Sequence, residues 1–250
     1  MKKLLLFFFV SYAGKSFSQD INVLLKQAVN YERLLKEDSA ILKYKEVLTA
    51  STDNIQALTK ISILTSAAGA RQVDKQTQKQ YFENAKSYAD KALAVDSNNV
   101  DAIYAKGFAL FKIIGTEQEN KKVAALEKEV YVCAAKALAV NPNHGRANFL
   151  MGKWNVDLVT TAWAKKAALN VLYGGIPDAS IENALLYMEK CRATDPYFMH
   201  NFLELAKAYK FNNNPSKAIE VLNQLVKLPY RTADDKGWKE EAKKILSELQ

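Results

Sequence analysis

The chain has little glycine, proline and cysteine: its 250 residues include 9 Gly, 5 Pro and 2 Cys. An all-β protein with many tight turns needs more Gly and Pro than this, because these residues dominate turns. The scarcity of cysteine excludes a disulfide framework. We expect Cys133 and Cys191 to be buried thiols, and a single bridge between them is the alternative.

Histidine is equally scarce, and the motifs of common catalytic sites are absent. The two histidines, His144 and His200, form no recognisable metal-binding set with Cys, Asp or Glu. The sequence contains no Gly-x-Ser-x-Gly, His-Glu-x-x-His or Gly-rich phosphate loop. We therefore predict that the protein is not an enzyme and uses no cofactor or metal ion.

No apolar run is long enough to span a bilayer, which takes about 20 residues. The run at 4–10 follows Lys2 and Lys3, and the small residues Ser16 and Ser18 occupy the −3 and −1 positions of a cleavage site. This pattern is typical of a secretory signal peptide, and a buried N-terminal helix is the alternative. We predict a signal peptide at 1–18, export to the periplasm, and a mature chain with no stable membrane span.

A strong excess of positive charge is also missing. The formal net charge is +8, and part of it comes from lysines of the predicted signal peptide. A nucleic-acid-binding domain usually carries a clustered basic patch, so we expect no nucleic-acid partner. Helix-favouring Ala, Leu, Lys and Glu are abundant, and no segment shows the strict alternation of a strand. The pattern predicts an all-α protein with about eleven helices, the longest of them at 145–173.

The sequence Lys-Ala-Leu-Ala-Val occurs twice, beginning at 91 and again at 136, a period of 45 residues. Repetition at a fixed period indicates stacked copies of one supersecondary unit. Aligned on the turns at Thr52, Ser97, Pro142 and Pro196, the copies place small residues where paired helices cross closely. These predicted packing positions are Ala92, Gly107, Ala137, Gly152, Cys191 and Ala206.

The packing positions and the closing prolines resemble the tetratricopeptide repeat. The usual period of that repeat is 34 residues, so the helices or connectors here are longer. The resemblance implies one helical-repeat solenoid over 19–250, with antiparallel helices wound into a right-handed superhelix.

A closer resemblance covers roughly the second half of the chain. It is carried by Met-Gly-Lys-Trp at 151–154, Trp-Ala-Lys-Lys-Ala-Ala at 163–168, Tyr-Gly-Gly-Ile-Pro at 173–177 and Leu-Ala-Lys-Ala-Tyr at 205–209. These segments are similar to the regulator of microtubule dynamics family. The resemblance implies a tetratricopeptide-like solenoid, and animal members of the family are associated with microtubules and organelles. Because the predicted signal peptide directs this chain out of the cytosol, we do not extend microtubule binding to it.

In stacked helix pairs, the first helix of each pair lines the concave face. The alignment predicts a groove in which aromatic side chains supply contact area and cations attract acidic groups. The predicted groove residues are Tyr104, Phe108, Phe111, Arg146, Phe149, Lys153, His200, Leu203, Lys207 and Lys210. The alternative is that Phe108, Phe111 and Phe149 are core residues and that the helix at 145–173 fills the groove.

The sequence thus favours a non-enzymatic, exported helical-repeat scaffold that binds a protein or peptide partner through its concave groove. The alternative function is binding of a small apolar ligand beside a periplasmic transporter. That alternative is suggested by similar exported solenoids and by the aromatic residues Tyr104, Phe149 and Trp154.

Overall fold

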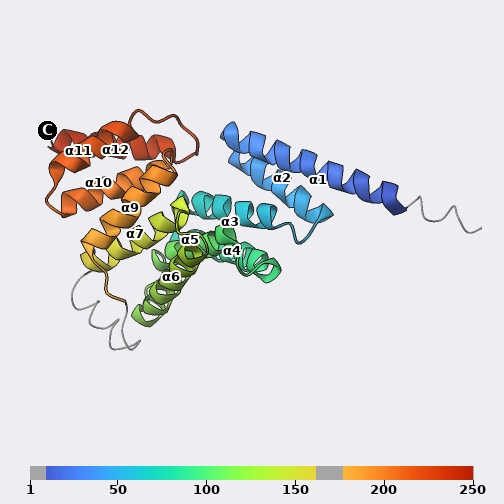
Figure 1. Cartoon of the computed structure of the whole chain (residues 1–250), viewed down its shortest axis with the longest axis horizontal. Coiled ribbons are helices and arrows are strands. Elements are labelled where there is room, and N and C mark those ends of the chain that lie inside the picture. Colours follow the sequence, from blue (N-terminus) through green and yellow to red (C-terminus); the bar gives the residue numbers. More distant parts are fainter. Residues whose placement is uncertain (1–9, 162–176, 250) are drawn as a thin grey trace, which may run out of the picture.

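The computed structural model describes residues 10–161 and 177–249, with side chains described from residue 20 onward. These residues form eleven α-helices joined by turns and loops, with no strand among them, as the composition predicts (Figure 1). The helices are α1 (Val10–Arg33), α2 (Glu37–Ala50), α3 (Ile55–Ala70), α4 (Lys75–Val95), α5 (Val100–Ile114), α6 (Asn120–Val140), α7 (Gly145–Thr160), α9 (Ile181–Thr194), α10 (Met199–Phe211), α11 (Pro215–Leu225) and α12 (Asp235–Leu249).

The helices pack as successive pairs, which are α1 with α2, α3 with α4, α5 with α6, α7 with α9, and α10 with α11. The first helices of neighbouring pairs also contact one another, in the order α3, α5, α7 and α10. Helix α12 follows the last pair and packs on both α10 and α11. This is the predicted helical-repeat solenoid, extended by one helix at its C-terminal end.

The turns between pairs begin each first helix in the same way. Asn54, Asn99 and His144 occupy equivalent positions, one period apart, and each is the N-cap of the helix that follows. Their side chains accept hydrogen bonds from the backbone N–H of Ala57, Ala102 and Ala147, at 2.9, 3.0 and 3.1 Å. Such caps satisfy amide groups that the helix itself leaves unbonded. The histidine Nδ1 therefore replaces the amide oxygen of asparagine in the third copy.

The small residues predicted at helix crossings are all buried. A Cβ added to Gly107 would lie 2.5 Å from Cδ2 of Leu150, and one added to Gly152 would lie 2.6 Å from Cγ of Met188. At Gly152 the backbone carbonyl of Ala184 is also close, at 3.1 Å from the added atom. These crossings have no room for a larger side chain.

The predicted long helix at 145–173 is wrong in its extent, because α7 ends at Thr160. The Thr160 and Thr161 hydroxyls donate hydrogen bonds to the carbonyls of Val156 and Asp157, at 2.8 and 2.6 Å. Thr161 itself has an extended backbone, with ψ of 136°. β-branched residues and hydroxyl groups that bond to the backbone both weaken a helix. Trp163 and the rest of that predicted helix, 162–173, lie outside the described residues.

Both cysteines are free and buried, so the alternative of a Cys133–Cys191 bridge is wrong. Burial raises the pKa of the Cys133 thiol to about 11 and that of the Cys191 thiol to about 12. The two thiols belong to different packing clusters: Cys133 packs with Leu150 and Trp154, and Cys191 packs with Phe149.

Helix α1 runs from Val10 to Arg33 and includes the predicted cleavage position after Ser18. The signal peptide remains a prediction. Within the described residues, no helix combines the length and the apolar character that crossing a membrane requires.

Candidate functional site

A cavity of about 860 Å³ lies on the concave side of the solenoid. The largest share of its wall comes from α3 and α5, which are first helices of neighbouring pairs. The turn between α1 and α2, the beginnings of α7 and α10, and the segment 231–238 complete the lining. A cavity of this volume is typical of a site for a small ligand or a few side chains of a larger one.

The apolar part of the lining is contributed by three separate segments. Ile63 and Leu64 come from α3, Phe108 from α5, and Trp238 from the first turn of α12. The rings of Tyr104 and Phe108 stack with their centroids 5.7 Å apart. The cavity therefore offers both aliphatic and aromatic surface to a bound group.

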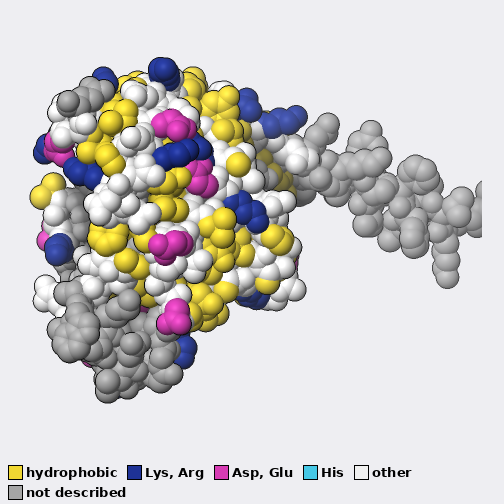
Figure 2. Space-filling view, turned by 60° about the vertical axis from the view of Figure 1, so that its left-hand side comes forward, with side chains coloured by type: hydrophobic (Ala, Val, Ile, Leu, Met, Phe, Trp, Pro, Cys, Tyr) yellow, Lys and Arg dark blue, Asp and Glu magenta, His cyan; other side chains and the backbone are white. Residues whose placement is uncertain are grey.

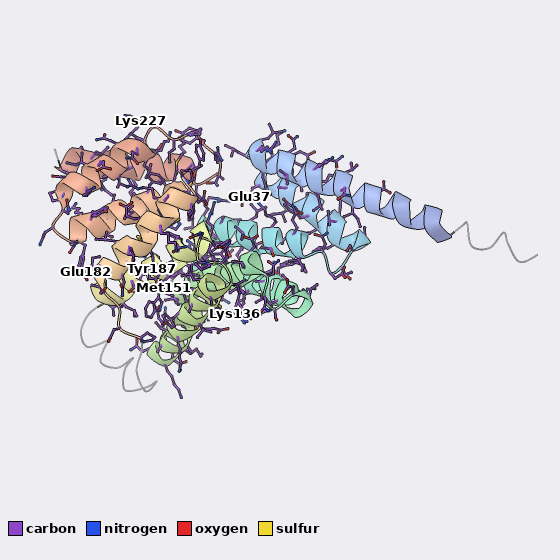
Figure 3. The ribbon with its side chains drawn as sticks, in the orientation of Figure 1. Glu37, Lys136, Met151, Glu182, Tyr187 and Lys227 are labelled. Atoms are coloured by element: carbon purple, nitrogen blue, oxygen red, sulfur yellow. The ribbon has the colours of Figure 1, made fainter. Side chains whose placement is uncertain are left out.

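An arginine at the end of α3 connects the two ends of the solenoid. The Arg71 guanidinium contacts a carboxylate oxygen of Glu37 at 2.5 Å and one of Asp234 at 2.7 Å. We call these three residues the Arg71 bridge. Figure 1 shows the loop before α12 reaching towards the turn between α1 and α2, and Figure 3 shows Glu37 at the end of α2 that faces the C-terminal helices. Burial raises the pKa of Glu37, although the charge of Arg71 opposes the increase.

Most charged groups of the lining are paired with one another or with neighbours. Lys60 contacts Glu32 at 2.9 Å, and Arg146 contacts Asp195 at 2.7 Å. The Arg146 guanidinium also lies 3.6 Å from the centroid of the Phe198 ring. Since these charges are held by internal partners, they define the shape of the cavity more than they attract a ligand.

Some polar side chains of the lining lack a partner within the described residues: the buried hydroxyl of Thr59 makes no hydrogen bond, and Lys112 and His200 are two further cases. Among the residues that the structure describes, Lys112 has no carboxylate within 4 Å and the His200 ring makes no hydrogen bond. Burial lowers the pKa of Lys112. Burial, together with the charge of Lys112, lowers the pKa of His200 to about 3, so its imidazole is neutral at neutral pH.

The structure brings only part of the predicted groove to this cavity. Tyr104, Phe108, Arg146 and His200 line it. Phe111 lies beside it, with the ammonium groups of Lys112 and Lys153 at 5.9 and 5.2 Å from the centroid of its ring.

Two predicted groove residues are core residues instead, and their placement in the groove has to be corrected. Phe149 is fully buried against Cys191 and Phe198, with the two phenyl centroids 4.9 Å apart. Leu203 is buried in the cluster that α10 forms with α11 and α12. The alternative of a core role is thus right for Phe149, while Phe108 belongs both to the core and to the cavity wall.

The predicted groove lysines of α7 and α10 are not available as free cations. Lys153 contacts Asp157 and Glu204, and Lys207 contacts Glu204 and Glu241. Lys210 contacts Glu248 at 3.0 Å. Glu241 and Glu248 belong to α12, which the repeat alignment does not include. The correction has a simple cause: the added helix covers α10 and neutralises its lysines.

Sequence reasoning missed the cavity residues of α3 and of the C-terminal segment. Gln56, Thr59 and Ile63 precede Asp101, Tyr104 and Phe108 by one period of 45, and they line the cavity. The same repeat alignment could therefore have identified them. Trp238 and the Arg71 bridge carry no repeat signal, because their contacts depend on how the ends of the chain meet.

Charged side chains elsewhere on the surface are mixed in sign. Figure 2 shows Lys and Arg interspersed with Asp, Glu and apolar residues on the face that includes the C-terminal helices. No group of three or more His, Cys, Asp or Glu that could hold a metal ion occurs among the residues that the structure describes.

The sequence matches a family model described as Regulator of microtubule dynamics protein 1-3 over residues 24–250. Regulator of microtubule dynamics protein 1 of Mus musculus is 31% identical over 115 residues, which are 46% of this chain and 38% of that protein. The Bos taurus protein of the same name is 27% identical over 163 residues, 64% of this chain and 50% of that protein. The matches thus span half or less of the length of these relatives.

Solved structures with the same fold are more distant in sequence. A thermophilic TPR protein of Thermus thermophilus has a TM-score of 0.62 at 13% identity and is matched over 91% of this chain and 99% of its own. The Pseudomonas aeruginosa pilF protein has a TM-score of 0.53 at 13% identity, over 94% of this chain and 90% of its own. At such identities the likeness shows the tetratricopeptide-like fold alone.

Proposed function

Because the chain belongs to the regulator of microtubule dynamics family, we propose that it is a non-enzymatic scaffold that binds a short segment of a partner protein in its concave cavity. The family and the helical-repeat fold suggest a role in protein interaction. The observation that carries the proposal is the cavity of about 860 Å³ between α3, α5 and the segment 231–238.

The size and lining of the cavity determine what kind of partner it suits. A folded domain is too large for it, whereas a few side chains of an extended or helical segment fill such a volume. Phe108 and Trp238 provide the aromatic surface that contributes most to binding energy in protein interfaces. The paired charges around them form a polar rim, which favours one orientation of the segment.

We further propose that residues 1–18 are removed during export and that 19–250 act as one domain in the periplasm. The basic start, apolar run and small cleavage residues support this proposal. Mass spectrometry of the protein from its native host tests it: the expected mature chain begins at Gln19. Intact protein that still carries Met1 would contradict it.

The names of the relatives describe regulators of microtubule dynamics. Since the matches span half or less of those proteins and a signal peptide is predicted here, we do not propose microtubules as the partner. A cosedimentation assay with polymerised tubulin checks this point. Saturable binding would show that microtubules are a partner of this chain after all.

The cavity assignment is tested by filling the cavity. Ala67 lies on the α3 wall, and Ala67→Trp places an indole where a ligand would lie. The matched control is Ala125→Trp on α6, where the alanine is exposed. We expect crosslinked partners from envelope extracts to disappear with Ala67→Trp and to persist with Ala125→Trp, provided both variants keep the helical circular dichroism and unfolding midpoint of the parent. Unchanged capture by Ala67→Trp would show that the cavity is not the binding site.

The second candidate function is binding of a small ligand with an apolar body. The Arg71 bridge favours it, because the bridge joins the two ends of the solenoid beside the cavity. Native mass spectrometry of gently purified protein should then show an added mass that is lost in Ala67→Trp. A mass equal to that of the bare chain in every preparation would count against this function.

A further inference from the structure

Among the charged groups of the cavity lining, the ammonium group of Lys112 has no ion-pair partner within the described residues. The acids of the lining have partners: Glu32 contacts Lys60, Glu37 and Asp234 contact Arg71, and Asp101 contacts His144. Arg231 is exposed at the rim, where it stacks on the Tyr197 ring. Lys112 is partly buried on α5 and makes no ion pair within the described residues. A charge in this position is expensive unless a counter-charge or water meets it.

The surroundings of Lys112 are largely apolar. Its Nζ lies 5.1 Å from the centroid of the Phe108 ring and 5.9 Å from that of Phe111. Ring faces attract a cation, but the gain is small compared with that from a carboxylate. The charges of Asp234 and Glu204 act on Lys112 from further away, and both acids already have closer cations.

His200 provides a second unused polar group in the same lining. Its ring stacks on Trp238, with centroids 4.8 Å apart and planes at 6°, and Phe149 lies 4.8 Å away on a tilted plane. The charge of Lys112 contributes to the low pKa of His200. A neutral imidazole retains one N–H donor, which is available to a ligand.

We propose that Lys112 and His200 form an anion subsite that binds the carboxylate of a ligand whose apolar body lies against Phe108 and Trp238. The proposal rests on the function proposed above, since it names the chemistry of the group that enters the same cavity. A single ammonium and one neutral donor match a single negative charge. A phosphate dianion would be disfavoured by the nearby Asp234 and Glu204.

This chemistry has two sources, an acidic residue of a partner segment or a small free carboxylic acid. The experiment therefore has two arms, both measured by isothermal titration calorimetry on the full mature chain. The first compares octanoate with 1-octanol, which share the alkyl body. The second compares the acetylated, amidated pentapeptide Ser-Leu-Glu-Leu-Ser with its Gln counterpart. In at least one arm we expect the acid to bind about tenfold more tightly than its neutral form, the size of one charged hydrogen-bonded contact.

Variants then test whether the tighter binding of the acid depends on Lys112 and His200. Lys112→Met keeps the length of the stem and should remove the preference for the acid while leaving the affinity of the neutral probe unchanged. His200→Phe keeps the ring but not the N–H donor, and should reduce the preference about threefold. The matched control is Lys106→Met on the same helix, whose ammonium contacts Asp90 at 3.0 Å and Glu129 at 3.1 Å. It should behave as the parent does.

Three outcomes would overturn the proposal: acids that bind no more tightly than their neutral forms, a preference that survives Lys112→Met, and no acid binding in either arm. If the neutral probes bind to the parent and not to Ala67→Trp, the cavity remains the binding site although the anion subsite is wrong. The arm that shows the preference identifies the source of the carboxylate.

Discussion

The two halves of the concave face have the same repeat architecture but a different surface. In the half formed by α3 and α5, the inward residues line a cavity. In the half formed by α10, His200 still lines the cavity, but Leu203 is buried in the core, and Lys207 and Lys210 form ion pairs with α12. Tyr104 and Leu203 occupy the same repeat position and both are buried, at 2% and 1% exposure, but only Tyr104 also contributes to the cavity wall.

The difference shows that a repeat position does not by itself determine whether a side chain borders a cavity. It determines which way a side chain points, and the next element of the chain decides whether anything covers it. At the C-terminal end that element is α12, which supplies Ile245 and Leu246 to the core and Glu241 to Lys207. At the other end of the face no extra helix lies over α3 within the described residues, and the cavity remains.

Removing α12 is the strongest test of this comparison. Truncation after Asp234 exposes Leu203 and removes Ile245 and Leu246, so we expect a loss of about 3–6 kcal/mol in the free energy of unfolding. Urea unfolding followed by circular dichroism measures it. If the truncated chain does not fold, Leu246→Ala should still cost about 2–3 kcal/mol. A truncated chain as stable as the parent would show that α12 is not part of the core.

Replacing Glu204, the buried acid of α10, tests whether it neutralises Lys153 and Lys207. Burial tends to raise the pKa of Glu204, but Lys153 and Lys207 lower it to about 2. The contribution of this carboxylate to stability is therefore present above about pH 4.5 and is lost as the pH falls towards 2. Glu204→Gln should destabilise the protein by about 2–4 kcal/mol at pH 7.

The same substitution should flatten the decline in stability below pH 4.5, as urea titrations at several pH values would show. Glu241→Gln is the control, because this residue is at the exposed end of the same network and its loss should have a smaller effect. Equal effects of the two substitutions would contradict the central role of Glu204.

His200 lies where the two halves meet, between the cavity and the first turn of α12. Its pKa of about 3 is below that of an unfolded histidine, which is about 6.5. The unfolded chain therefore takes up a proton first, and stability is lost as the pH falls from about 6.5 towards 3. Between pH 7 and 5.5 we expect a decline of about 1 kcal/mol, which His200→Phe should abolish. A decline that persists in this variant would assign the effect to another group.

The general fold could be predicted because it depends on local, repeated signals. The period of 45 identified the helix pairs, and the small residues at Gly107 and Gly152 lie at crossings where the structure leaves no space for a Cβ atom. Asn54, Asn99 and His144 repeat the cap at the same period. Such features depend on a few neighbouring residues, so a single sequence contains them.

The candidate site could be predicted only in part, because it depends on contacts between distant segments. The alignment included Tyr104 and Phe108, and its period could have added Thr59 and Ile63. It could not show that Trp238 would stack on His200 or that Asp234 would meet Arg71. The end of α7 at Thr160 was also missed, since the apolar periodicity continues while hydroxyl bonds to the backbone end the helix.

Breaking the Arg71 bridge should cause the smallest change in the free energy of unfolding among these tests. It also tests most directly the contact between the two ends of the solenoid. Its two ion pairs are partly exposed, so Arg71→Gln should lower the free energy of unfolding by only about 0.5–1 kcal/mol. The loss should shrink when salt is raised from about 0.05 M to about 1 M, because the Debye length falls. Lys86→Gln is the control, since Lys86 pairs within its own helix, with Asp90. Hydrogen exchange should become faster in the first turns of α2 and α12 with Arg71→Gln and nowhere else. Because each half keeps its own core, a general increase in exchange would mean that the bridge supports the whole solenoid and not only the closure of the cavity.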